Sequence, residues 1–291
     1  MDIDFELKNL LSEIDILKEK WDLCMPLSED EGRMLKEDLE ITQTYNSNAI
    51  EGNTLSLAET KAILLHGVTI EGKPLKDHLE AINHVFAMRF IDKIAFNTDK
   101  TLKESEILEI HRLILTDIRP EEAGSYRKAN VRVGGSWRKF PKPEEVKKLM
   151  DDFIDEMNSK IGKLHPVILS AKIHQGLVFI HPFIDGNGRT ARLLMNLTLL
   201  RNGYPPACIY YNERKDYYAA LESANFGDTK GFEYVIASAV KNSMEDYLSF
   251  VKVKNKNAEL KQSVKSENTP EPDAFSKDLQ NRLGKGKGWD R

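Results

Sequence analysis

Apolar residues recur every three or four positions along most of this chain, with charged residues between them. This spacing predicts amphipathic helices that each bury one face against a core. An amphipathic leading helix is expected over residues 5–21, with Pro26 close behind it. Further helical stretches, several with a glycine or proline near a boundary, cover residues 31–50, 75–96, 102–115, 143–157 and 168–179. The pattern therefore predicts a mainly α-helical protein.

Local capping signals place two helix boundaries between residues 50 and 60. Gly52 suits the left-handed conformation that commonly closes a helix, so the stretch over 31–50 should end there. Ser56 and Glu59 have the spacing of a capping box, in which each side chain bonds to the backbone N–H of the other residue. Another helix should therefore start near Ser56.

Residues 129–140 break the helical pattern. Residues 129–133 are partly β-branched and indicate an extended segment, and Gly134 and Gly135 supply a turn. Residues 136–140 then lead back before Pro141. This arrangement predicts a short β-hairpin.

Composition narrows the class of protein. The 291 residues are 41% hydrophobic, enough for one large core with appendages. Lysine and arginine number 42 against 46 acidic residues, so the net charge of −4 gives no general reason to expect nucleic acid or an anionic membrane as partner. Any anion site must therefore be local.

The small number of cysteines and the lack of a recognisable targeting signal favour a cytoplasmic protein. Cys24 and Cys208 are too few for a disulfide framework and are not spaced like zinc ligands. No segment approaches the roughly 20 apolar residues of a spanning helix, and the acidic start lacks the basic region of a signal peptide. After Lys252 apolar residues become sparse, so residues 251–291 are expected to form a polar, mobile tail.

The densest polar chemistry lies in residues 181–192, directly before the apolar run 193–197. Gly186 and Gly188 flank Asn187 and permit unusual backbone angles, so successive N–H groups can point the same way. The buried helix that follows adds unsatisfied N–H groups and the positive end of its dipole. The combination predicts a site for a phosphate chain.

Charged side chains in the same run complete this site. Arg189 and Arg192 are three residues apart on the helix and can donate to one anion. Asp185 offers an oxygen ligand for Mg²⁺, the usual companion of nucleotide phosphates. His181 has an ordinary pKa of about 6.5 and can act as general base toward an incoming hydroxyl. A P-loop is excluded because residues 186–190 lack its spacing and its lysine.

The run from His181 to Arg192 resembles the signature of the Fic family, in which a His, a Phe, an acidic residue, Gly-Asn-Gly-Arg and a second Arg occur in this order. Every one of these positions is filled here. The resemblance extends from about residue 47 to about residue 248. It implies a mainly α-helical Fic-type domain with a short β-hairpin flap and an N-terminal inhibitory helix. The implied divisions are an N-terminal region over 1–60, a catalytic core over 61–250 and the tail over 251–291.

The resemblance also implies an activity and roles for the site residues. Fic adenylyltransferases (AMPylases) transfer AMP from ATP to a Ser, Thr or Tyr hydroxyl of a target protein. By this resemblance His181 is the base, Asp185 binds Mg²⁺ and Arg192 faces the γ-phosphate. The remaining nucleotide-binding residues are Gly186, Asn187, Gly188 and Arg189 around the α- and β-phosphates, and Tyr218 and Asn225 at the nucleoside. The residues of the target-binding flap are Val131, Arg132, Val133, Gly134 and Gly135.

A second motif lies upstream of the signature. Ser47, Glu51 and Gly52 match the family's inhibitory pattern, a Ser or Thr followed four residues later by Glu and then Gly or Asn. By this resemblance Glu51 pairs with Arg192 and takes the donor that the γ-phosphate needs.

Other readings of the same residues stay open. The site could remove AMP from a modified protein, with Glu51 activating a water, or it could be a regulatory module that only binds nucleotide. His111 and His174 lie on apolar helices and are expected to be structural. The sequence names no target protein, leaves the nucleotide donor open beyond the resemblance, and is compatible with self-modification and with a homodimer.

Overall fold

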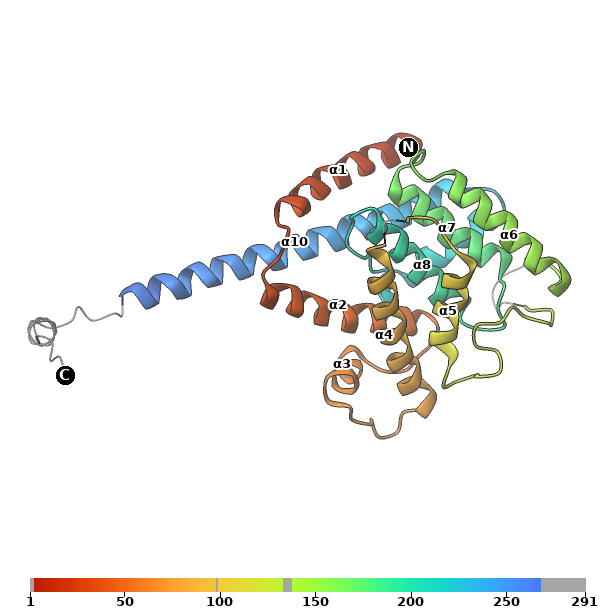
Figure 1. Ribbon diagram of the computed structural model, residues 1–291, viewed down its shortest axis with the longest axis horizontal. Coiled ribbons are helices and arrows are strands. Elements are labelled where there is room, and N and C mark those ends of the chain that lie inside the picture. Colours follow the sequence, from red (N-terminus) through yellow and green to blue (C-terminus); the bar gives the residue numbers. More distant parts are fainter. Residues whose placement is uncertain (1–2, 98, 133–137, 268–291) are drawn as a thin grey trace, which may run out of the picture. The chain divides into compact units, whose positions relative to one another are not determined.

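A computed structural model describes residues 3–97, 99–132 and 138–267, with side chains described as far as Val251. The described residues are mainly helical, as the hydrophobic pattern predicts (Figure 1). The helices are α1 (Ile3–Leu23), α2 (Glu29–Ile50), α3 (Leu57–His66), α4 (Leu75–Ala95), α5 (Glu104–Leu115), α6 (Pro143–Ser159), α7 (Pro166–Ile180), α8 (Asn187–Arg201), α9 (Arg214–Asn225) and α10 (Thr229–Glu267), with a 3₁₀ turn at Tyr211–Glu213.

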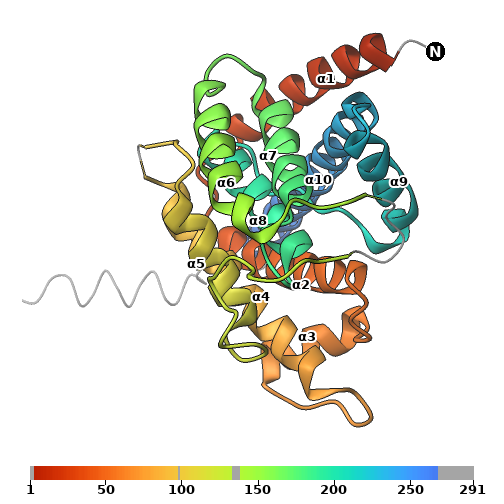
Figure 2. The ribbon, with the colours of Figure 1, turned by 90° about the vertical axis from the view of Figure 1, so that its right-hand side faces the viewer.

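Helix α8 lies at the centre of the fold. It packs against α7, α4, α5 and α2, and Figures 1 and 2 show it among these helices. Nearly all of its side chains are buried, including Leu194, Leu197 and the two arginines of the signature. Apolar residues of α4, α5, α6 and α7 close around it in one hydrophobic cluster. The helix that opens at the predicted phosphate site is therefore packed on most of its surface by the core.

Capping chemistry explains where the neighbouring helices start. Ser56 and Glu59 form the predicted capping box, so α3 begins at Leu57. A second box, formed by Ser28 and Glu31, starts α2 at Glu29, two residues before the predicted boundary. Gly52 adopts a positive φ of 98° directly after α2, the conformation for which glycine was predicted there.

Helix α1 covers the core from outside through Leu7, Leu10 and Ile14, which are buried. Near its end the ring of Trp21 packs 6.3 Å from that of Tyr247 in α10. The predicted amphipathic leading helix is therefore confirmed, and it docks on the body of the protein.

The β-hairpin is not seen. The described residues 129–132 and 138–140 form no β-strand, and the predicted turn at Gly134 and Gly135 lies outside the described residues, as does Val133. Val131 and Arg132 lie on the first arm, which is irregular. The alternation of β-branched residues is too short to establish a strand without a partner strand.

Residues predicted to form the tail begin inside a helix. The chain divides into two units, Met1–Leu248 and Ser249–Arg291, and the helical backbone of α10 continues through Glu267. The divisions at residues 60 and 250 and the mobility of the tail stay predictions. Among the described residues, no helix is both long enough and apolar enough to cross a membrane.

Candidate active site

His181 lies at the turn between α7 and α8. It follows the last residue of α7 and adopts a left-handed conformation with φ of 54°, unusual for a residue with a side chain. Its N–H donates to the Leu177 carbonyl at 2.8 Å, which closes the helix. Gly186, with φ of 78°, then caps the start of α8. Two left-handed residues therefore bring His181 and the N-terminus of α8 to the two ends of one short loop.

Asn187 holds this loop in shape. Its side-chain oxygen accepts from the Phe183 N–H at 3.0 Å, and its side-chain nitrogen donates to the Phe183 carbonyl at 2.9 Å. The Phe183 ring stacks on His111, with 3.6 Å between ring centroids. Because the Gly124 N–H donates to Nδ1 of His111, the ring proton is on Nε2, which donates to the Asp185 carbonyl at 3.1 Å. His111 is therefore structural, as predicted.

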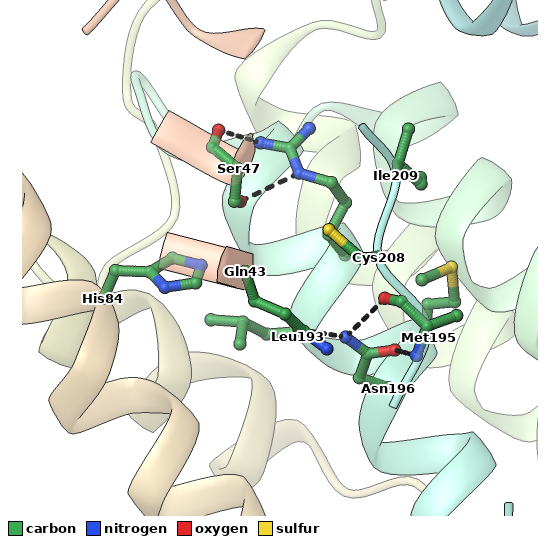
Figure 3. Close-up of a pocket in the computed structure, with 10 residues that line it drawn as sticks. Gln43, Ser47, His84, Leu193, Met195, Asn196, Cys208 and Ile209 are labelled. Carbon is green, nitrogen blue, oxygen red and sulfur yellow. Dashed lines mark hydrogen bonds between the residues drawn. The ribbon is translucent and has the colours of Figure 1, made fainter. Parts of the chain in front are cut away.

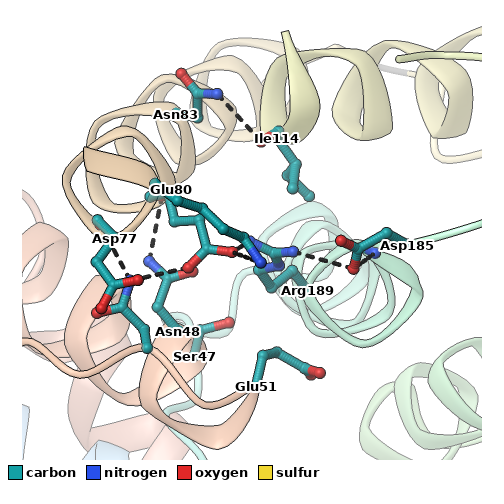
Figure 4. A network of polar contacts seen from close by, with 12 residues as sticks. Ser47, Asn48, Glu51, Asp77, Glu80, Asn83, Ile114, Asp185 and Arg189 are labelled. Carbon is teal, nitrogen blue, oxygen red and sulfur yellow. Dashed lines mark hydrogen bonds and ion pairs between the residues drawn. The ribbon is translucent and has the colours of Figure 1, made fainter. Parts of the chain in front are cut away.

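Arg189 lies between two carboxylates. Its guanidinium is 3.0 Å from Oε1 of Glu80 and 3.4 Å from Oδ1 of Asp185, and Figure 4 shows these acidic groups on opposite sides of it. Oδ1 of Asp185 also accepts from the Gly186 N–H at 2.6 Å. Burial works to raise the pKa of Asp185, but the charge of Arg189 and the Gly186 hydrogen bond outweigh it and lower that pKa. Asp185 is therefore ionised at the mouth of the loop.

Arg192 connects α8 to the end of α2. Its Nε donates to Ser47 Oγ and its Nη2 to the Ser47 carbonyl, both at 2.9 Å; Figure 3 shows Ser47 with these two bonds, in a pocket that Arg192 also lines. The same Nη2 donates to Oε1 of Glu51 at 2.8 Å. Burial works to lower the pKa of Arg192, and the nearby Glu51 carboxylate more than offsets it, so that pKa is raised. The predicted contact of Glu51 with Arg192 is present.

Glu51 occupies space directly over the loop. A Cβ placed on Gly188 would collide with Oε1 of Glu51 and would lie 3.2 Å from Nη1 of Arg192. The carboxylate of Glu51 therefore sits against the backbone of the glycine that was predicted to approach a phosphate.

Comparisons with known proteins agree with this geometry. The sequence profile of the Fic/DOC family matches residues 101–199. A solved structure of Fic-1 from C. elegans is 33% identical, with a TM-score of 0.79 over 87% of this chain and 74% of that one. A Fic domain-containing protein from Bacteroides thetaiotaomicron is 31% identical, with a TM-score of 0.76 over 82% of this chain and 98% of that one. This chain belongs to the Fic/DOC family.

A curated relative carries the name of an activity. A protein from Nematostella vectensis, named protein adenylyltransferase Fic, is 41% identical over 206 residues, which are 70% of this chain and 48% of that protein. The chain thus spans about half the length of the curated Fic relatives it matches. The match to the family profile ends at residue 199 and begins at 101, so Ser47, Glu51, Tyr218 and Asn225 lie outside it.

The two predicted nucleoside residues, Tyr218 and Asn225, lie apart from the signature loop in sequence and make different contacts. The hydroxyl of Tyr218 donates to the Ile50 carbonyl at 3.3 Å, and its side chain is 36% exposed. Asn225 ends α9 and accepts from Arg138 at 3.4 Å. Tyr218 therefore contacts the end of α2 and Asn225 contacts Arg138, and the contact of either residue with a nucleoside stays a prediction.

Two functional neighbours were missed in the sequence. Glu80 of α4 binds Arg189 and also accepts from Asn53 at 2.9 Å, so it links α8 to the segment after Glu51. The Tyr217 hydroxyl lies 3.4 Å from Arg192 and 3.0 Å from Nε2 of His174, which is fully buried. No motif marks Glu80. Tyr217 precedes the predicted Tyr218, and its buried position on α9 could have been expected from helical spacing.

The residues of the Fic loop fit Mg²⁺ bound with a nucleotide. Mg²⁺ is commonly held by one or two carboxylates together with phosphate oxygens and waters, rather than by a cage of side chains. Asp185 supplies such a carboxylate at the loop, and its Oδ2 lies 3.8 Å from Nε of Arg119. Among the described residues there is no group of three acidic, His or Cys side chains that could bind a metal without a nucleotide.

Buried histidines should make this Fic protein sensitive to acid. Burial is the main cause that lowers the pKa of His84 and His174 to about 3 and that of His111 and His181 to about 4. Unfolded histidines bind protons near pH 6.5, so between pH 6.5 and 4 the unfolded state holds more protons. Stability is therefore complete well above pH 6.5 and falls as the pH is lowered, by up to about 1.4 kcal/mol per pH unit for each histidine.

Urea unfolding at pH 7.5, 6.5 and 5.5 measures this effect. The free energy of unfolding should fall by about 0.4 kcal/mol per buried histidine between pH 7.5 and 6.5, and by about 1 kcal/mol per buried histidine between pH 6.5 and 5.5. A His66→Gln variant is the control for loss of a histidine as such, since His66 is exposed and burial does not act on it. Equal stability at pH 6.5 and 5.5 would contradict the burial argument.

Proposed function

We propose that this chain transfers AMP from ATP to a hydroxyl of a target protein and that Glu51 inhibits the transfer. The observation that carries the proposal is the position of Glu51, whose carboxylate contacts Arg192 at 2.8 Å against Gly188. The Glu51 carboxylate thus occupies the position that we assign to a phosphate. The loop beside it and the start of α8 contain every residue of the family signature, including the phosphate-binding residues and the histidine that serves as base. The curated relatives named protein adenylyltransferase Fic support the same activity.

His181 is the base in this reaction. Burial lowers the pKa of its imidazole to about 4, and the positive charges of Arg127 and Arg138 act in the same direction. The ring is therefore neutral at pH 7 and can accept the proton of an attacking hydroxyl. A bond forms between the hydroxyl oxygen and the α-phosphorus as the bond to pyrophosphate breaks, so the target gains AMP and pyrophosphate leaves.

The loop and α8 hold the phosphates during this step. The Gly186 N–H is bonded to Asp185, and the N–H groups of Asn187 and Gly188 follow it at the start of α8, where unsatisfied donors and the helix dipole favour an anion. Arg189 and Arg192 add charge-assisted donors that stabilise negative charge on phosphate oxygens. Asp185 would hold Mg²⁺, which when bound neutralises part of the phosphate charge.

Inhibition follows from competition for Arg192. Nη2 of Arg192 donates to both Ser47 and Glu51, so a γ-phosphate that needs this nitrogen must displace Glu51. ATP can still enter beside Glu51, but its phosphates are held away from the arrangement that aligns the α-phosphorus with the attacking hydroxyl. Glu51 is 31% exposed at its side chain and can withdraw without unfolding the core.

We assign the nucleoside and the target protein to two different sets of residues. Tyr218 and Asn225 bind the nucleoside, and Val131, Arg132, Val133, Gly134 and Gly135 hold the target as an extended segment. The acceptor is a Ser, Thr or Tyr of another protein or of this chain. A homodimer and a cytoplasmic location belong to the same proposal.

The position of Glu51 also favours a second candidate, removal of AMP from a modified protein. Its charge acts on His181 and raises that pKa against the effect of burial, so the two groups lie in one electrostatic environment. In this reaction Glu51 orients a water that attacks the α-phosphorus, and the protein hydroxyl leaves. Loss of Glu51 then abolishes the reaction.

Labelled ATP tests the direction and chemistry of transfer. Glu51→Gly protein should be incubated with host lysate, Mg²⁺ and ATP labelled either at the α- or at the γ-phosphate. Label should become protein-bound from α-labelled ATP and not from γ-labelled ATP. Protein-bound label from γ-labelled ATP would show phosphoryl transfer and overturn the proposal, and no label from either would favour AMP removal.

A further inference from the structure

Arg127 lies behind the catalytic loop and contacts three separate parts of the backbone. Its Nε donates to the His181 carbonyl at 2.8 Å. Its Nη1 donates to the Ala129 carbonyl at 3.0 Å and its Nη2 to the Pro141 carbonyl at 2.6 Å. Ala129 begins the predicted hairpin and Pro141 directly follows it, so these two residues flank the segment that contains the predicted target-binding residues. One side chain thus joins both ends of that segment to the backbone of the predicted base.

This arrangement, here named the Arg127 bridge, is specific to a guanidinium. Each of the three carbonyls accepts a hydrogen bond from a different nitrogen of Arg127. Among the amino acids, only arginine has a side chain with three nitrogens in one fixed plane. The backbone N–H of Arg127 adds a bond to the Pro182 carbonyl at 2.9 Å. A lysine has one ammonium nitrogen and cannot reach three acceptors arranged in this way.

The burial of Arg127 argues against a role in surface charge. The residue is 5% exposed, and within the described residues no carboxylate lies at ion-pair distance from it. A buried cation is costly unless its hydrogen bonds are satisfied, and here neutral carbonyls satisfy them. The three carbonyls that accept from Arg127 belong to His181, Ala129 and Pro141. The buried guanidinium therefore connects the catalytic loop to residues on both sides of the predicted flap.

A neighbouring contact reinforces the second end of the segment. Phe179 lies two residues before His181 in the sequence. Arg138 donates to the Phe179 carbonyl at 2.6 Å, and its guanidinium lies over the Phe179 ring. The Phe140 ring packs 4.5 Å from the His181 imidazole. The chain leading to Pro141 therefore touches both the backbone and the ring of the base.

We infer that Arg127 is a positioning residue, which holds Ala129 and Pro141 at a fixed distance from His181 so that a target hydroxyl meets the imidazole. This inference rests on the proposed function, because it takes the described residues on the two sides of the predicted flap, 129–132 and 138–141, as lying beside the bound target. Arg127 touches neither the nucleotide loop glycines nor Arg189 and Arg192, so nucleotide binding does not depend on it. Transfer does, because a misplacement of about 1 Å can cost about a hundredfold in rate.

Arg127→Lys in the full chain, in the Glu51→Gly background, tests the inference. Lysine keeps the positive charge and most of the length of the side chain but cannot make the three hydrogen bonds of the bridge. Arg112→Lys is the matched control, since Arg112 is exposed on α5 and pairs with Glu109. For each protein, three quantities are measured: the Kd for ATP with Mg²⁺, the labelling of lysate proteins from α-labelled ATP, and hydrogen exchange of peptides from 127–132, 138–142, α7 and α8.

Arg127→Lys should keep its ATP Kd within about twofold and lose about ten- to a hundredfold of its labelling rate. Exchange should quicken in the peptides from 127–132 and 138–142 and stay unchanged in α7 and α8. The control should match its parent throughout.

Unchanged exchange at both ends would overturn the inference. So would faster exchange throughout α7 and α8 with an equal loss of ATP affinity, because Arg127 would then be a general structural residue. If the Glu51→Gly parent transfers no label, the proposed function fails, and the exchange of the two ends alone decides whether the Arg127 bridge exists.

Discussion

Replacing Glu51 with glycine should raise the rate of AMP transfer about ten- to a hundredfold, because one charge-assisted contact to a buried arginine is worth roughly 1.5 to 3 kcal/mol. The substitution removes the 2.8 Å contact of Glu51 with Arg192. Arg192 keeps its two bonds to Ser47, so its guanidinium remains in place, and the Nη2 hydrogen that pointed to Glu51 becomes available to a phosphate. The measurement is the initial rate of protein labelling from α-labelled ATP.

The chain offers a matched control for this substitution. Glu71 also precedes a glycine of positive φ, Gly72, and it is exposed, so Glu71→Gly changes backbone freedom and charge in the same way without touching Arg192. Its rate should equal that of the unmodified protein. Equal rates for Glu51→Gly and Glu71→Gly would show that Glu51 does not inhibit transfer. Removal of AMP, if this is the activity, should instead be lost in Glu51→Gly.

The helices could be predicted from sequence because their apolar faces repeat locally. The stretch predicted over residues 143–157 is α6, which buries Val146, Met150 and Phe153 against the core. Helix α9 was not predicted, since it buries only Tyr217, Leu221 and Ala224 among polar residues, too few to produce a clear period. Local periodicity therefore predicted best the helices with the widest apolar faces.

The residues of the candidate site also differ in how well the sequence predicts them. His181, Asp185 and Arg192 were predicted because the loop and the start of α8 are contiguous in sequence. Glu80 and Arg127 were not predicted, because each acts through contacts with residues far away in the chain, Arg189 and His181 respectively. Glu51 was found only through its motif, since a glutamate before a glycine is otherwise an ordinary helix end.

Replacing His181 should remove transfer while leaving ATP binding intact. A positioned general base contributes about 10²- to 10⁴-fold to a rate, so the Glu51→Gly background should lose labelling by about that factor. His181 has φ of 54°, which alanine tolerates poorly, and asparagine is the better replacement because it adopts left-handed conformations readily. His181→Asn therefore keeps the turn between α7 and α8 and removes only the base.

Comparing His181→Asn with His181→Ala separates chemistry from backbone geometry. If His181 acts as the base, both variants lose labelling, and His181→Asn binds ATP with Mg²⁺ as tightly as its parent does. His66→Asn, at an exposed histidine, should retain full labelling. If His181→Asn keeps more than about a tenth of the parent rate, the loss falls below the range expected for a general base. His181 would then serve the turn rather than the proton transfer, and the base would have to be sought among other groups at the loop.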